Sequence, residues 1–127
     1  MKRIIFAICT LLCANVLWAQ NLFTVGDIQY EITGTNEVEV DSASTSATSI
    51  VIPETIDYEG LTYNVTSIDT WAFDSHTNLT SVTIPNSIVS IGKGAFYGCT
   101  GLTSMDIPNS VTTIDTLAFY GCTGLTS

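Results

Sequence analysis

Residues 65–87 read VTSIDTWAFDSHTNLTSVTIPNS, and residues 88–110 read IVSIGKGAFYGCTGLTSMDIPNS. The two segments agree at 12 of 23 positions, and a third copy, VTTIDTLAFYGCTGLTS, begins at residue 111. The segment AFYGCTGLTS occurs without change at 95–104 and again at 118–127. Self-similarity at a period of 23 residues is typical of a solenoid, in which each repeat forms one coil and neighbouring coils stack.

Each repeat has an apolar pattern that predicts one short strand followed by tight turns. Val82 and Ile84 alternate with polar residues, as in a strand with one buried face, and Pro85 follows at once. Proline has no N–H to donate to a ladder, so the strand ends there. Met105 and Ile107 repeat the pattern one period later, which predicts a stack of parallel strands. Further residues are expected to turn inward and stack on their counterparts, namely Ile88 and Val111, Ile91 and Ile114, Ala95 and Ala118, and Phe96 and Phe119.

An earlier, partial repeat precedes the regular ones. Residues 47–56 read ATSIVIPETI and align with LTSVTIPNSI at residues 79–88. Residues 56–64 then interrupt the pattern before the regular units begin. This insertion is predicted to form a loop or a hairpin arm.

The repeat pattern V-x-x-I-x-x-x-A-F-x-x-C-x-x-L-x-x-V-x-I-P-x-S resembles the BspA-like leucine-rich repeats of bacterial surface proteins. The resemblance covers residues 65–127 strongly and residues 47–56 in part. It implies a leucine-rich-repeat solenoid over residues 47–127, a right-handed, strand-rich β/α superhelix with very short helical turns. The family's general role implies display on, or release from, a bacterial cell and binding to host proteins or other cells.

The segment before the solenoid, residues 20–46, resembles that family's N-terminal β cap. DIQYEI at 27–32 and EVEV at 37–40 alternate as two short strands, with Gly34 between them as the turn. A cap is expected because the end coil of a solenoid would otherwise expose its apolar stacking surface.

Residues 1–19 have the pattern of a secretory signal peptide. Lys2 and Arg3 precede an apolar run at residues 4–12, and Ala19 offers a small residue for cleavage. The run is shorter than the roughly 20 residues that a membrane-spanning helix needs. We therefore expect an exported protein, on the cell surface or outside the cell, with no membrane insertion after cleavage.

The charge balance excludes one class of partner. After cleavage, Lys93 is the only cation against twelve Asp and Glu, so the net charge is 1 − 12 = −11. Such a surface repels nucleic acid and anionic lipid headgroups. We expect no nucleic-acid binding.

No residue pattern points to catalysis, a metal site or a cofactor. Cys99 and Cys122 occupy equivalent positions in consecutive repeats, and His76 occupies the same position in the repeat before them. A disulfide is one interpretation, and a row of small buried thiols is the plainer one. His76 is the only histidine, and its repeat position indicates a structural role. Gly92-Lys93-Gly94 lacks the remaining residues of a phosphate loop and is expected to be a surface turn.

The outward side of the strand stack is the strongest candidate binding surface. Strand faces of solenoids commonly bind partners, although rows of Thr also favour strands by propensity alone. The candidate residues, which form a flat stripe rich in Thr and Ser, are Thr80, Ser81, Thr83, Thr103, Ser104 and Asp106.

Two functional hypotheses follow. The first is an exported adhesion or interaction module that binds a protein or cell-surface ligand, with host proteins among the candidates. The second is a spacer without a ligand, in a longer surface protein whose functional domain lies beyond Ser127. The third repeat stops before its strand, which predicts an open apolar edge and favours either a fragment or end-to-end association of two chains.

Overall fold

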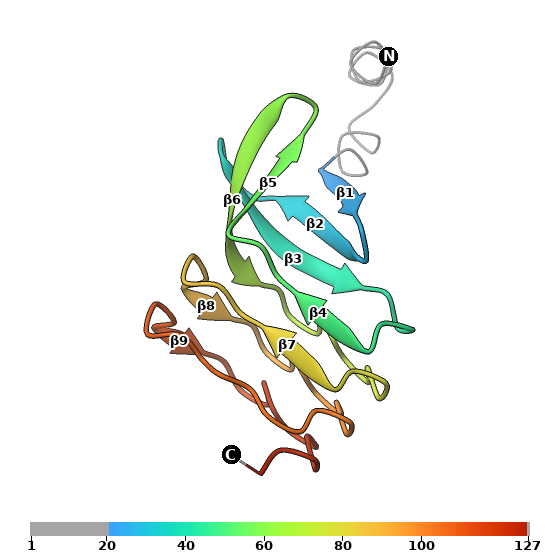
Figure 1. Cartoon of the computed structure of the whole chain (residues 1–127). Coiled ribbons are helices and arrows are strands. Elements are labelled where there is room, and N and C mark those ends of the chain that lie inside the picture. The colour runs from blue at the N-terminus through green and yellow to red at the C-terminus, as the bar shows by residue number, and fades with distance from the viewer. Residues whose placement is uncertain (1–20, 127) are drawn as a thin grey trace, which may run out of the picture.

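A computed structural model describes residues 21–126, so the predicted signal peptide lies outside the described residues. The regular elements within this range are strands, and Figure 1 shows them stacked in successive coils toward the C-terminal end. No helix in this part of the chain is long and apolar enough to cross a membrane. The strand bounds are β1 Leu22–Val25, β2 Ile28–Ile32, β3 Glu37–Ala43, β4 Ser49–Val51, β5 Thr55–Tyr58, β6 Leu61–Ile68, β7 Ser81–Thr83, β8 Ser90–Ile91 and β9 Thr113–Ile114.

The larger sheet joins the N-terminal strands to the coils. Strands β1, β2 and β3 form an antiparallel meander, and β6, β8 and β9 continue from β3 as parallel neighbours. The strands predicted at 27–32 and 37–40 are therefore formed, as β2 and β3, and Gly34 lies in the loop between them. The meander packs on β5 through aromatic side chains, since the rings of Phe23 and Tyr58 stack with centroids 3.9 Å apart.

The insertion at residues 56–64 forms part of a hairpin, as one of the two predictions proposed. Strand β5 pairs antiparallel with β6 through a two-residue turn at Glu59 and Gly60. Both turn residues have positive φ, 51° and 81°, as a type I′ turn requires. The hairpin projects from the N-terminal end of the coils in Figure 1.

A second sheet of two strands covers the other side of the coils. Strands β4 and β7 pair in parallel, and the inward residues Ile50 and Val82 are buried. The predicted third strand, at residues 105–107, is not formed. Thr103 N–H still donates to the Thr80 carbonyl oxygen, at 3.4 Å, so the segment follows the same path with too few bonds for a ladder.

Alternating hydrogen bonds, with no continuous helix, build the turn edge of the coils. The N–H of Phe73 donates to the carbonyl oxygen of Ala95 in the next coil at 2.7 Å. The N–H of Asp74 instead donates back to the Trp71 carbonyl oxygen, three residues earlier, at 3.0 Å. Because every second N–H leaves the turn, the coils are joined along this edge and a helical ladder cannot form. The bonds between the first and second coils run from residues 71, 73 and 75 to residues 93, 95 and 97.

Identical residues stack on one another in the core, as the repeat predicted. The rings of Phe73 and Phe96 lie 4.9 Å apart with an interplanar angle of 4°, and those of Phe96 and Phe119 lie 5.4 Å apart at 3°. Stacking at one period buries apolar surface that a single coil could not enclose.

Burial decreases toward the third coil, where two expectations are wrong. Ile91 is 1% exposed, but its counterpart Ile114, which was expected to face inward, is 47% exposed. Ile107 is likewise exposed, whereas Ile84 is buried. The reason is that within residues 21–126 no further coil stacks on these side chains.

Candidate interaction surfaces

The stripe predicted to bind a partner lies on the outward side of the two-stranded sheet. Ser81 and Thr83 point outward from β7, and Thr80 directly precedes that strand. In Figure 1, β4 and β7 run side by side on this face. All six predicted residues are exposed, and we call them the Thr/Ser face: Thr80, Ser81, Thr83, Thr103, Ser104 and Asp106.

The residues of this face differ in how freely they can contact a partner. The Thr80 hydroxyl donates to the Thr48 carbonyl oxygen at 2.9 Å, so part of its hydrogen-bonding capacity is used within the fold. Thr103, Ser104 and Asp106 lie on irregular backbone, because the third strand is not formed. The structure thus holds two of the six residues, Ser81 and Thr83, on a strand.

The cysteines occupy a repeated, buried structural position. Cys99 and Cys122 are free thiols, and each Sγ donates at 3.0 Å to the carbonyl oxygen of a phenylalanine in the preceding coil. The acceptors are Phe73 and Phe96 respectively. Burial raises the pKa of Cys99 to about 12, so its reactive thiolate is scarce at neutral pH. The prediction of buried thiols is confirmed.

His76 fills the same position in the first coil and serves the fold. Its Nε2 lies 3.0 Å from the Ala43 carbonyl oxygen at the end of β3, and its Nδ1 lies 3.0 Å from the Asp74 carbonyl oxygen. The imidazole of His76 thus contacts the N-terminal meander, whereas the smaller thiols of Cys99 and Cys122 contact the preceding coil. With both ring nitrogens directed at backbone carbonyls, His76 is poorly placed to act as a base on an external substrate.

Two equivalent aspartates close turns, and a glycine replaces them in the middle coil. The Asp69 and Asp115 carboxylates each accept a bond from the next residue's N–H at 2.6 Å, whereas Gly92 stands at the corresponding position. A Cβ at Gly92 would lie 2.7 Å from the Thr70 nitrogen, so the coils approach too closely there for a side chain. Lys93, which follows it, lies exposed on a turn, as expected.

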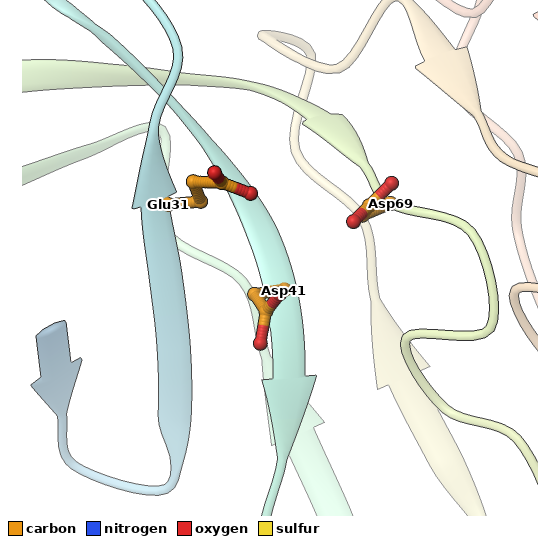
Figure 2. Close-up of side chains that lie close together, drawn as sticks. All are labelled: Glu31, Asp41 and Asp69. Atoms are coloured by element: carbon orange, nitrogen blue, oxygen red, sulfur yellow. The ribbon is translucent and has the colours of Figure 1, made fainter. Parts of the chain in front are cut away.

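Three carboxylates that sequence reasoning did not single out lie together on the larger sheet. Figure 2 shows Glu31 on β2, Asp41 on β3 and Asp69 just after β6, and their candidate ligand oxygens lie within 4.8 Å of one another. All three side chains are partly exposed. Nearby, desolvation followed by the charge of Asp69 raises the pKa of Glu39. Clustered carboxylates are common on exposed acidic surfaces, and here they make protonation of Glu39 more favourable.

Comparison with known proteins agrees with the repeat architecture. Residues 42–127 match the BspA type leucine rich repeat region in six copies. No significantly similar protein is found among those with curated functions.

Solved structures of bacterial leucine-rich repeat proteins resemble this chain closely. A leucine-rich repeat protein from Bacteroides ovatus is 32% identical with a TM-score of 0.78, over 83% of this chain and 28% of that one. A leucine rich cell surface protein from Faecalibacterium prausnitzii is 30% identical with a TM-score of 0.74, over 83% and 29%. A leucine-rich repeat protein from Bacteroides capillosus is 33% identical with a TM-score of 0.78, over 83% and 78%.

The chain therefore spans less than a third of the first two of these relatives and over three quarters of the third. The family match covers more than half of the sequence, and the stacked 23-residue coils give the physical reason for it. The chain belongs to the BspA-type leucine-rich repeat family.

Proposed function

We propose that this chain is an exported interaction module, displayed on the cell surface or released, that binds a protein or cell-surface ligand through the Thr/Ser face. The observation that carries the proposal is the exposure of all six residues of that face on a scaffold with a buried, stacked core. A solenoid presents such rows on a rigid surface, which lowers the entropy cost of binding.

The properties of the other candidate groups support binding without chemistry. Cys99 has a raised pKa, and His76 directs both ring nitrogens at backbone carbonyls. Leucine-rich repeats generally serve as scaffolds for protein–protein contact. The acidic composition further disfavours nucleic acid as the partner.

Export rests on the sequence of residues 1–19 and on the resemblance to a cell surface protein of Faecalibacterium prausnitzii. The test is the intact mass of the native protein, measured separately in the medium and the cell envelope. We expect a chain that begins at Gln20 in one of these fractions. Recovery from the cytoplasm with residues 1–19 retained would contradict export.

Binding is tested by exposing the purified protein to cultured host cells and to immobilised matrix proteins. Saturable binding is expected, and it should weaken when Ser81 and Thr83 are both changed to Lys. Thr24→Lys, which adds one such positive charge on the exposed side of β1, is the control.

A spacer role is the second candidate, since the chain spans only 28% of its Bacteroides ovatus relative. It predicts no saturable binding by this segment to cells or matrix proteins. Association of two chains through the exposed Ile107 and Ile114 stays a prediction as well, and the molar mass from light scattering tests it.

A further inference from the structure

Three aromatic side chains lie in contact along the turn edge of the coils, and none of them belongs to the Thr/Ser face. Tyr97 and Tyr120, one period apart, stack with ring centroids 5.2 Å apart and an interplanar angle of 16°. The Trp71 ring meets Tyr97 edge-on at 5.5 Å. Trp71 and Tyr120 remain 42% and 60% exposed. We call these three side chains the aromatic row.

The backbone under Trp71 favours a smaller residue than tryptophan. Trp71 has a φ of 61°, and its counterpart one period later is Gly94, with a φ of 60°. Glycine adopts this left-handed conformation without strain, whereas a bulky residue does not. Leu117, one further period along, has a φ of 62°, so this left-handed turn recurs in every coil, and the residue that occupies it differs from coil to coil.

The next coil is shaped to receive the Trp71 ring. A Cβ on Gly94 would lie 2.1 Å from Cζ3 and 2.2 Å from Cε3 of the indole. Any side chain at Gly94 would therefore displace the ring from its place beside Tyr97. The pair of residues, tryptophan in one coil and glycine in the next, holds the aromatic row together.

One carboxylate shares the repeat position of the two tyrosines, and the described chain as a whole is strongly acidic. Asp74 occupies the repeat position of Tyr97 and Tyr120, is exposed, and accepts a bond from the Ser75 hydroxyl at 3.0 Å. Residues 21–126 contain twelve acidic residues and a single Lys or Arg, Lys93, which also lies on this edge. A cation approaching the edge is attracted by this field and by the ring faces.

We propose that the aromatic row, together with Asp74, binds arginine or lysine side chains of a basic protein segment. This adds a second surface to the interaction module and rests on the proposed function only for the general role in binding. The guanidinium of arginine stacks on a ring and also pairs with a carboxylate, so the combination present here suits it. A neutral glycan could stack on the same rings, but it would gain nothing from the negative charge.

The probe is a fluorescent synthetic peptide in which arginine alternates with glycine, titrated into the purified protein at low ionic strength. Trp71→Gly and Tyr120→Ser should each weaken binding roughly 2- to 5-fold, since each removes one exposed cation–π contact. Trp71→Gly keeps the fold, because glycine is the residue that this backbone favours. Circular dichroism and the thermal midpoint of each variant verify folding.

A matched pair of charge changes separates a local site from general attraction. Asp74→Asn and Asp27→Asn remove the same charge, but Asp27 is an exposed residue between β1 and β2, outside both the aromatic row and the Thr/Ser face. We expect Asp74→Asn to weaken peptide binding and Asp27→Asn to leave it within twofold. Lys93→Gln, which removes the cation on this edge, should strengthen binding.

Several results would overturn the proposal. Equal loss from Asp74→Asn and Asp27→Asn would show general electrostatic attraction, and equal binding of a peptide with neutral citrulline in place of arginine would exclude a cation site. Binding of neutral cellohexaose that Trp71→Gly abolishes, without arginine-peptide binding, would make the row a glycan site. Because the peptide assay contains no cells or matrix, its failure leaves the proposed function intact, and failure of cell binding alone leaves the aromatic row intact.

Discussion

Phe96 occupies the centre of the aromatic stack in the core, and truncating it tests whether stacked coils stabilise the protein. Its side chain is fully buried between Phe73, at 4.9 Å, and Phe119, at 5.4 Å. Replacing a buried phenylalanine by alanine costs about 3–5 kcal/mol, through lost apolar burial and the cavity that remains. Such a loss is comparable with half the total stability of an ordinary small domain.

Phe119→Ala is the matched control for this prediction. Phe119 is only partly buried and stacks on one phenylalanine instead of two. We therefore expect Phe119→Ala to lower the free energy of unfolding by at least about 1 kcal/mol less than Phe96→Ala does, because one stacking contact is missing and part of the ring is already exposed. The assay is urea unfolding followed by Trp71 fluorescence. Equal costs for the two variants would refute the reasoning, because a stack of coils must stabilise its middle member more than its last.

Three further predictions concern other parts of the fold. Burial and neighbouring carboxylates raise the pKa of Glu39, so protonation of Glu39 favours the folded state. The free energy of unfolding should therefore rise as the pH falls through that pKa. Glu39→Gln should raise the thermal midpoint at neutral pH and weaken the dependence of stability on pH. The thiol of Cys99 should react with Ellman's reagent only on unfolding, since its pKa is about 12 and it is buried; fast reaction in the native protein would contradict this. Gly101→Ala should destabilise the protein by more than about 1 kcal/mol, because the new Cβ would lie 2.5 Å from the Thr77 carbonyl oxygen. The control is Gly34→Ala, whose Cβ would lie nearest to the flexible end of a glutamate side chain. Similar thermal midpoints for the two variants would contradict this prediction.

The core could be predicted from the sequence because identity at one period carries geometric information. Phe96 and Phe119 are 23 residues apart in identical surroundings, so stacked coils must place one ring over the other. The same argument correctly assigned Cys99 and Cys122 to a buried row. Strand β1 was missed, although Gly26 directly follows it and turns the chain into β2 with a φ of 62°.

The repeat pattern does not predict the structure correctly where contacts with a neighbouring coil decide whether a strand or a buried side chain forms. Residues 105–107 have the alternation of a strand, but a strand exists only where enough backbone bonds to a neighbour form. Ile114 has the apolar character of a core residue, but its burial also depends on a neighbour, because a further coil would have to cover it. The sequence pattern of each repeat sets which residues can be buried, and the neighbours decide which are.

The surfaces depend on contacts that the repeat does not encode. Glu31 and Asp69 come together only because β2 and β6 both flank β3, a pairing that no spacing in the sequence reveals. The variation among Trp71, Gly94 and Leu117 at one repeat position looks like ordinary divergence until the structure places the Trp71 ring over Gly94. Both features depart from the repeat, and departures from a repeat are where a ligand can be recognised specifically.

We propose that this solenoid binds a partner through its exposed Thr/Ser face, and one comparison of three proteins tests this most directly. The binding of the purified protein to host cells is measured for the wild type, for the double variant Ser81→Lys and Thr83→Lys, and for Thr24→Lys. We predict saturable binding that the double variant loses and Thr24→Lys retains. Undiminished binding by the double variant, or no saturable binding by any of the three, would contradict the account.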